Sequence, residues 1–370
     1  MNRTPNPGIS IIVCCYNSEQ RIVTTLEHLA RQKMNLGVDW EVVLVDNRSA
    51  DKTVDIASRK WTELGDPAPL SIVFEEQAGL SFARKKGIAS SSFDLLILCD
   101  DDNWLDEQYA QILFDIFEAD QEVGACGGLG TSVTSKSIDV PQWFLKFEHQ
   151  YAVGSQNTGE GEVKRDWVFG AGMGIRRDAL NHIENNGFVS LLKDRTGASL
   201  SSGGDVELCY ALRLAGYKIW YSPRLKFKHE IPEARLTWAY ITNLMTSKGQ
   251  AIDGLQPYRN AISGSIQQKA PHWIQILMFR LLKHLIATLK HLVSLGESRQ
   301  SRHLSRLSSK GNLQSILKLR SRIRANYEQV FRLSENLKSS RKGESCRPLL
   351  PLDRVTHKIT KRVSVDDESV

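Results

Sequence analysis

The sequence predicts an α/β fold, with a mostly parallel central sheet flanked by helices and a helical extension at the C-terminal end. Short apolar, β-branched runs alternate with stretches whose apolar residues recur at helical spacing, which is typical of β-α-β units. Polar residues cluster directly after several of the apolar runs. No run of about eighteen apolar residues occurs, so a membrane-spanning helix is not expected.

The predicted elements follow the chain in order. Strands are expected at 9–15, 40–45, 70–74 and 94–99, and the helices between them at about 18–29, 51–61 and 79–89. A helix over 106–117, a strand over 123–128, a helix from about 204 and a strand over 219–227 complete the predicted core. Sequential strands joined by helices favour right-handed crossovers and hence a parallel arrangement.

Charge is distributed unevenly along the chain. The net charge of 370 residues is +6, yet residues 296–345 alone hold twelve Lys or Arg and four Glu. The basic character therefore belongs to the C-terminal region, and no zinc, helix-turn-helix or RNA-binding motif accompanies it, so no nucleic-acid partner is expected. The six cysteines form no CxxC pair, and no signal peptide is visible, which favours a reducing, cytoplasmic location.

An aspartate triplet, Asp100, Asp101 and Asp102, ends the apolar run 95–99 and is the centre of the candidate site. Three adjacent carboxylates repel one another, so they require a cation or a solvated position. A hard divalent metal that also binds phosphate oxygens would relieve the repulsion. The alternative is a solvated acidic turn that caps the next helix.

Polar side chains follow two other predicted strands. Tyr16 and Asn17 come after the first strand, and Asp46 follows the second. Because the carboxyl ends of parallel strands share one edge of a sheet, these groups are expected to lie near the aspartate triplet. Neither a Gly-x-Gly-x-x-Gly loop nor a Walker-type loop is present, so a metal at the triplet would have to neutralise a bound diphosphate.

Two further residues are candidates for chemistry. Asp205 follows two glycines at the expected start of a helix, where a carboxylate serves either as a cap or as a base. His229 lies at the end of the last predicted strand. A single histidine is more often structural, but near an aspartate cluster it becomes a candidate metal ligand.

Taken together, these segments resemble glycosyltransferase family 2, whose members have the GT-A fold. The resemblance covers roughly residues 10–230, and its matching segments are 10–17, 45–51, 79–87, 100–102 and 204–208. Two departures are visible. Gly204 stands where many members have Glu, and the QxxRW motif of processive polysaccharide synthases is absent, which implies transfer of a single sugar.

The resemblance implies a donor site. Tyr16, Asn17 and Asp46 would line the nucleotide pocket, and Arg84 matches a basic position on the nucleotide side. Asp100 and Asp101 would contact the nucleotide sugar.

The resemblance also implies a metal site and a base. Asp102 would be the closest ligand of Mg²⁺ or Mn²⁺, His229 would complete the metal shell, and Asp205 would deprotonate the acceptor hydroxyl. Contacts with the donor sugar or acceptor are expected, more weakly, from Trp167, Gly172 and Glu207; for Trp167 a core position is the alternative.

The implied function is metal-dependent, inverting transfer of one sugar from a UDP- or GDP-linked donor to a hydroxyl of a glycan or lipid-linked acceptor, in cell-surface polysaccharide synthesis. Two other hypotheses remain: a sugar-phosphate nucleotidyltransferase, and a non-catalytic protein that binds sugar nucleotides. The first of these normally has a Gly-rich, basic loop after strand one, where this chain has Cys14-Cys15-Tyr16.

Three segments are predicted: a GT-A domain at 1–235, a helical region at 236–295, and a basic helical segment with a flexible tail at 296–370. Within 271–295 an apolar stripe is opposed by Arg280, Lys283 and other basic residues, which predicts an amphipathic helix. Such a helix either packs on the main domain or lies on an anionic membrane, at the inner face of the cell membrane. A second basic helix is expected over 314–337.

Overall fold

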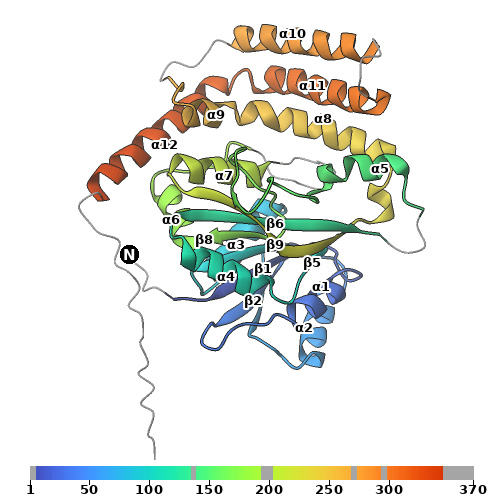
Figure 1. Ribbon diagram of the computed structural model, residues 1–370, viewed down its shortest axis with the longest axis vertical. Helices are drawn as coiled ribbons and strands as arrows, with labels where there is room; N and C mark the ends of the chain where they lie inside the picture. Colours follow the sequence, from blue (N-terminus) through green and yellow to red (C-terminus); the bar gives the residue numbers. More distant parts are fainter. Residues whose placement is uncertain (1–5, 135–138, 193–202, 268–272, 293–297, 345–370) are drawn as a thin grey trace, which may run out of the picture.

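The computed structural model describes residues 6–134, 139–192, 203–267, 273–292 and 298–344. In these ranges the centre is one β-sheet with helices on both faces (Figure 1). The strands are β1 Ile9–Cys15, β2 Trp40–Asp46, β3 Leu70–Phe74, β4 Leu95–Asp100, β5 Asn103–Leu105, β6 Val123–Val133, β7 Gly161–Glu162, β8 Met173–Arg176 and β9 Lys218–Glu230.

The helices cover the sheet and then form a separate layer. Those within the sheet region are α1 Ile22–Leu29, α2 Thr53–Glu63, α3 Leu80–Ser90, α4 Tyr109–Ala119, α5 Gln142–Phe147, α6 Arg177–Asn185 and α7 Gly204–Leu214. The C-terminal ones are α8 Trp238–Gly254, α9 Gln256–Ile262, α10 Trp273–Leu292, α11 Arg299–Leu319 and α12 Ile323–Glu344, and the 3₁₀ turns are η1 Glu148–Tyr151 and η2 Glu233–Arg235.

The sheet confirms the predicted α/β architecture. Its order is β3-β2-β1-β4-β8-β6-β9-β5, with β7 paired to β9. The first four strands in this order are parallel, as expected for β-α-β units. The other half also contains antiparallel pairs, since β8 runs against β4 and β6, and β5 runs against β9.

Both faces of β1, β2 and β4 are buried, which explains their continuous apolar runs, whereas the edge strand β3 is partly exposed. Alternate residues point to opposite sides: Ile11 and Val13 of β1 join a core with α1, α2 and α4, whereas Ile12 joins the core on the other face, with α3, α6 and α7. The strands of this half therefore lie between two apolar cores.

The strand register gathers the polar residues that follow β1, β2 and β4. Cys15 of β1 pairs with Asp46, and Cys14 pairs with Asp100. Since neighbouring strands are about 4.8 Å apart, Asp46 and Asp100 lie at strand ends separated by about 10 Å across the sheet. The predicted convergence at one sheet edge is therefore present in the backbone.

The C-terminal helices form a layer over the α7 side of the sheet. In Figure 1, α8, α11 and α10 are stacked, with α10 outermost, and α12 returns toward α6 and α7. Val330, Leu333 and Leu337 of α12 are buried in the same core as α7. The division of the chain at 235 and 295 remains a prediction, and the predicted tail at 345–370 lies outside the described residues.

The prediction of one helix over 314–337 was wrong. α11 already begins at Arg299 and ends at Leu319, and a turn at 320–322 separates it from α12. The turn lets Ile316 and Ile323 face each other in one small apolar cluster with Tyr327. Apolar residues in α11 and α12 on either side of the turn recur at helical spacing, so the sequence pattern resembles that of one continuous helix.

None of the helices in the described ranges combines the length and apolar character that crossing a lipid bilayer requires. Two helical glycines instead explain how α8 and α11 pack closely within the protein. A Cβ added to Gly249 would lie 2.1 Å from the Ser308 carbonyl oxygen, and one added to Gly311 would lie 2.1 Å from that of Thr246. The two helix backbones are in direct contact.

Because of this contact, a Gly-to-Ala substitution, which normally stabilises a helix, is expected to destabilise the protein here. Replacing an exposed helical Gly by Ala gains about 1 kcal/mol. Gly311→Ala is expected to lower the free energy of unfolding by about 1–3 kcal/mol instead, because the added methyl group meets backbone that must shift. Urea denaturation measures the change, with Ser305→Ala on the exposed side of α11 as the control. A stabilised Gly311→Ala variant would show that the two backbones are further apart.

Candidate active site

The most buried carboxylate of the aspartate triplet is that of Asp102, which is 4% exposed. Its Oδ1 lies 3.4 Å from His229 Nε2, and its Oδ2 accepts a hydrogen bond from Arg235 Nη1 at 3.2 Å. The two segments meet because β5 pairs with β9, so that Asn103 lies opposite His229. Burial raises the pKa of Asp102, but the positive charges of His229 and Arg235 outweigh it and lower the pKa to about 2.

His229 is stabilised in turn by Asp102. Burial lowers the pKa of its imidazole, but Asp102 outweighs burial, so the pKa is raised above its ordinary value. The other ring nitrogen, Nδ1, is buried, and no hydrogen-bond partner for it occurs in the described part of the chain. Asp102 and His229, which are 127 residues apart in sequence, therefore form one buried unit.

The other two aspartates of the triplet also carry arginine partners. Arg84 Nη2 of α3 lies 3.3 Å from Asp100 Oδ1, and Arg21 Nη2 donates to Asp101 Oδ2 at 2.7 Å. Ser18 Oγ donates to the same Asp101 oxygen. Burial and the charge of Asp102 raise the pKa of Asp101, against the opposing effect of Arg21. The repulsion expected from three carboxylates is thus reduced by one guanidinium for each.

Asp205 lies close to this group, at the beginning of α7. Its Oδ2 accepts a hydrogen bond from the Gly170 N–H at 2.8 Å, and Oδ1 accepts one from the Val206 N–H at 3.0 Å. A Cβ added to Gly170 would lie 3.3 Å from Asp205 Oδ2 and 3.4 Å from Arg84 Nη1. Arg84, which pairs with Asp100, therefore also lies near Asp205, so the predicted base is near the triplet.

Tyr16, Asn17 and Asp46 occupy the predicted side of the sheet edge. Tyr16 is 58% exposed. Asn17 has a left-handed φ of 49°, and its Oδ1 accepts a hydrogen bond from the Ala50 N–H at 2.8 Å. Asp46 is buried, with Oδ1 accepting from the Ser49 N–H at 3.0 Å. The loops after β1 and β2 are thereby fastened together beside an exposed aromatic ring.

The three residues predicted more weakly have structural partners in this fold. Trp167 is half-buried, and the Arg165 guanidinium stacks on its ring at 3.8 Å. Gly172 has a φ of +68°, and its carbonyl accepts the Tyr109 hydroxyl at 2.6 Å. Glu207 is buried and accepts hydrogen bonds from Ser190 Oγ and the Leu191 N–H. Contact of these three residues with a sugar remains a prediction.

A divalent cation fits part of this arrangement. In the described ranges, no group of three or more His, Cys, Asp or Glu side chains is arranged to hold a metal ion. However, Asp102 Oδ1 and His229 Nε2 are 3.4 Å apart, close enough to be neighbouring ligands of one ion, and both are donor types that divalent metals accept. Phosphate oxygens of a substrate commonly supply the other ligands.

Sequence reasoning missed three residues of the site, Ser18, Arg21 and Arg235. Ser18 and Arg21 lie where the sequence predicts only the start of a helix, and that pattern gives no signal for contact with Asp101. Arg235 follows the last strand, in η2. Its position six residues after His229 was a signal, since a residue just beyond a site strand often faces the same edge.

Comparisons with known proteins agree with this geometry. Residues 10–183 match the model of glycosyl transferase family 2. The putative glycosyltransferase EpsH of Bacillus subtilis is 30% identical over 105 residues, which are 28% of this chain and 29% of EpsH. The chain is 23% identical over 239 residues to the glucosyl-dolichyl phosphate glucuronosyltransferase of Haloferax volcanii, covering 63% of this chain and 72% of that protein. The chain thus spans less than a third of EpsH, and Asp205 and His229 lie beyond the family match.

Solved structures give the same fold. TarS residues 1–349 of Staphylococcus aureus, crystallised with UDP-GlcNAc, superpose with a TM-score of 0.51 at 16% identity, over 91% of this chain and 92% of that one. At this identity the likeness concerns the fold, which is the GT-A fold predicted from the sequence. With the family match over 10–183 and the paired aspartates at the sheet edge, this part of the chain is identified as a glycosyltransferase family 2 domain.

Proposed function

We propose that this protein is a metal-dependent, inverting glycosyltransferase that moves one sugar from a UDP- or GDP-linked donor to a hydroxyl of a glycan or lipid-linked acceptor. The proposed setting is cell-surface polysaccharide synthesis at the cytoplasmic face of the membrane. The family match over residues 10–183 supports a transferase and argues against the alternative hypothesis of a sugar-phosphate nucleotidyltransferase. One observation carries the finer proposal: Asp102, buried against His229 and Arg235, lies at the same sheet edge as Arg84 and Asp205.

The proposed role of the basic residues concerns the leaving group. Negative charge develops on a nucleoside diphosphate as its bond to the sugar breaks, and fixed positive groups stabilise that charge. Arg21, Arg84 and Arg235 are already positioned at this edge by Asp101, Asp100 and Asp102. Asp102 and His229 would hold Mg²⁺ or Mn²⁺, which supplies electrostatic stabilisation of the diphosphate when bound.

The proposed role of Asp205 is that of the base. A sugar hydroxyl is a poor nucleophile near neutral pH, so its proton has to be taken as it attacks. The Gly170 and Val206 N–H groups orient the Asp205 carboxylate, and Arg84 provides a nearby positive charge. One carboxylate that activates the acceptor leads to a single displacement, which inverts the anomeric carbon.

Nucleotide release tests the proposed reaction. The purified chain is incubated with UDP- and GDP-sugars and Mn²⁺, with and without EDTA, and released UDP or GDP is measured. We expect release from at least one donor and its loss with EDTA. Release that EDTA does not change would contradict metal dependence, and donor binding without turnover across the series would favour the non-catalytic alternative.

Asp102→Asn is expected to abolish metal-dependent donor binding while keeping the shape of the side chain. The amide lacks the negative charge that a divalent ion requires, so adding Mn²⁺ should no longer raise affinity for the donor. Isothermal titration with and without Mn²⁺ measures this, and Asp102→Ala provides the stronger truncation. Asp120→Asn, in a surface ion pair with Lys218, is the control. Unchanged dependence on Mn²⁺ in Asp102→Asn would remove Asp102 from the metal site.

Asp205→Asn is expected to bind donor normally but to lose roughly 10²–10⁴-fold in transfer rate, the usual contribution of a general base. The amide oxygen still accepts the Gly170 N–H, so the local structure should persist, but it cannot take a proton. Donor titration and nucleotide release measured on the same preparation separate the two effects. Asp178→Asn in the first turn of α6 is the matched control. An active Asp205→Asn enzyme would place the base elsewhere.

A further inference from the structure

Helix α10 presents an apolar face to the outside of the molecule. In the described residues, sixteen large hydrophobic side chains are exposed, and nine of them lie on this one helix. They include Met278, which is 61% exposed, and Leu292, which is 74% exposed. At 100° per residue the exposed positions 274–292 form a stripe about 160° wide along the helix. Soluble proteins rarely expose an apolar patch of this extent without a partner.

The inward side of α10 includes two basic side chains. Arg280 is 8% exposed, and His284 is partly buried on the same side. Burial, followed by the charges of Arg306 and Lys310 of α11, lowers the pKa of His284. The helix thus places Arg280 and His284 toward another basic helix, whereas most of its large apolar side chains face away from the protein, unlike those of an ordinary surface helix.

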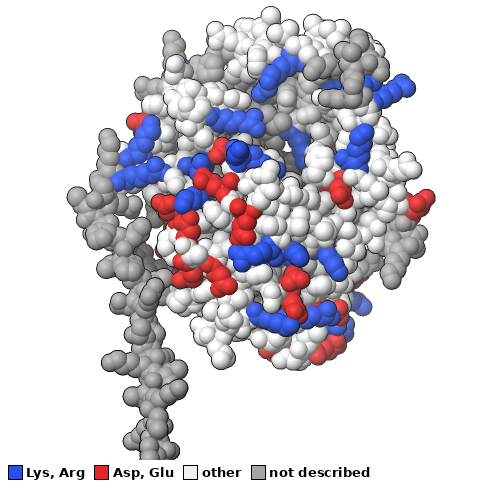
Figure 2. Space-filling view, viewed as in Figure 1, with Lys and Arg blue, Asp and Glu red and all other residues white. Residues whose placement is uncertain are grey.

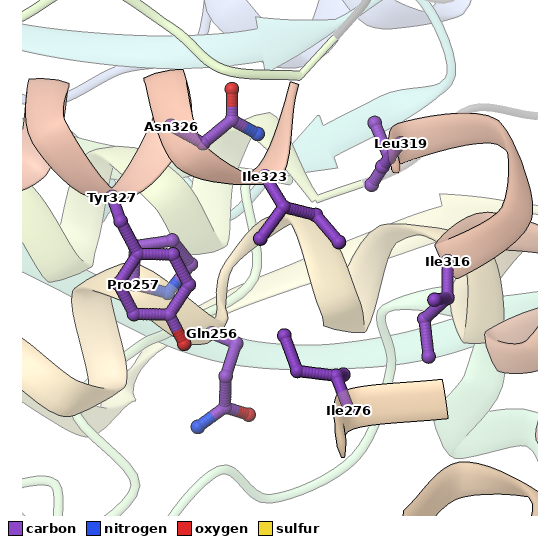
Figure 3. A pocket seen from close by; sticks show the side chains of 8 residues that line it. All are labelled: Gln256, Pro257, Ile276, Ile316, Leu319, Ile323, Asn326 and Tyr327. Carbon is purple, nitrogen blue, oxygen red and sulfur yellow. The ribbon is translucent and has the colours of Figure 1, made fainter. Parts of the chain in front are cut away.

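A few apolar residues anchor α10 by its N-terminal half. Ile276 and Leu277 pack against the small cluster of Ile316, Ile323 and Tyr327. Figure 3 shows Ile276 together with residues of α9, α11 and α12 around a pocket at this junction. The apolar stripe beyond this anchor makes no comparable contact in the described residues. Packing on the protein therefore explains where α10 lies, but it does not explain why nine large apolar side chains of this helix are exposed.

The positive charge of α10 and α11 indicates which kind of partner covers the apolar stripe. Helices α10 and α11 together contain eight Lys or Arg and no Asp or Glu. Lys283, whose ammonium lies over the Phe279 ring at 4.7 Å, borders the apolar stripe directly. In Figure 2 the upper part of the molecule shows Lys and Arg beside a broad white surface, whereas most of the acidic side chains lie lower. Two copies of this face would repel each other, whereas an anionic surface would attract it.

We propose that α10 is an interfacial helix that docks the protein on anionic lipid bilayers, with its apolar stripe among the acyl chains. An apolar stripe flanked by basic residues is the pattern that inserts into the headgroup boundary. Acidic headgroups would also attract Lys283, which is exposed beside the stripe. The helix lies in the plane of the membrane and does not cross it. This inference is independent of the catalytic chemistry proposed above.

Vesicle flotation of the full chain tests the proposal. Vesicles of phosphatidylcholine alone are compared with vesicles that contain phosphatidylglycerol at low and high salt. We expect at least about tenfold more protein with the anionic vesicles, and a decrease at high salt because exposed charges are screened. The double variant Leu282→Asp with Leu285→Asp should lose this binding, and Leu36→Asp, at a fully exposed leucine between α1 and β2, should keep it.

The results distinguish a lipid bilayer from a second copy of this chain as the partner of the apolar stripe. Both substituted leucines are exposed, so thermal stability should match the parent chain, and circular dichroism checks this before flotation. Equal binding of parent and double variant would overturn the proposal. A concentration-dependent dimer in light scattering that the double variant abolishes, without vesicle binding by the parent, would identify the face as a self-association surface instead.

Discussion

The buried pair of Asp102 and His229 is the interaction on which the candidate site depends. A carboxylate that is 4% exposed is stable only with positive partners, and here His229 and Arg235 provide them. The pair also joins the end of the parallel half of the sheet to its last strand, because Asn103 and His229 lie opposite each other. The same contact therefore links β4 and β5 to β9 and places two candidate metal ligands at the sheet edge.

The rest of the site is built outward from this pair by arginines. Each aspartate of the triplet has its own guanidinium, from the N-cap of α1, from α3 or from η2, so three separate segments are held at one edge by charge. Arg84 extends the network to Asp205 through the close approach at Gly170. Groups that neutralise carboxylates in the protein alone are also suited to bind a diphosphate, which links the stability of the site to its proposed function.

The C-terminal helices follow a different principle. α8 and α11 meet through glycines at backbone contact, and α12 is buried against the main core, so this part is firmly attached to the sheet domain. α10 differs, because Arg280 is buried on its inward side while nine of its large apolar side chains face out. A helix of this composition is satisfied at a boundary between water and an apolar phase, which an isolated protein in water does not offer.

From the sequence alone, apolar runs and parallel crossovers predicted the strands of the parallel half and the convergence of Asp46 and Asp100 at one sheet edge. The position of Asp205 beside them was implied only by the family resemblance. The sequence did not determine the arginine partners. Arg21 and Arg235 contact aspartates 80 and 133 residues away, and no local pattern records such a distance. Amphipathic spacing showed that α10 has two faces, but only tertiary packing decided which face is outside, since periodicity carries no information about the neighbour.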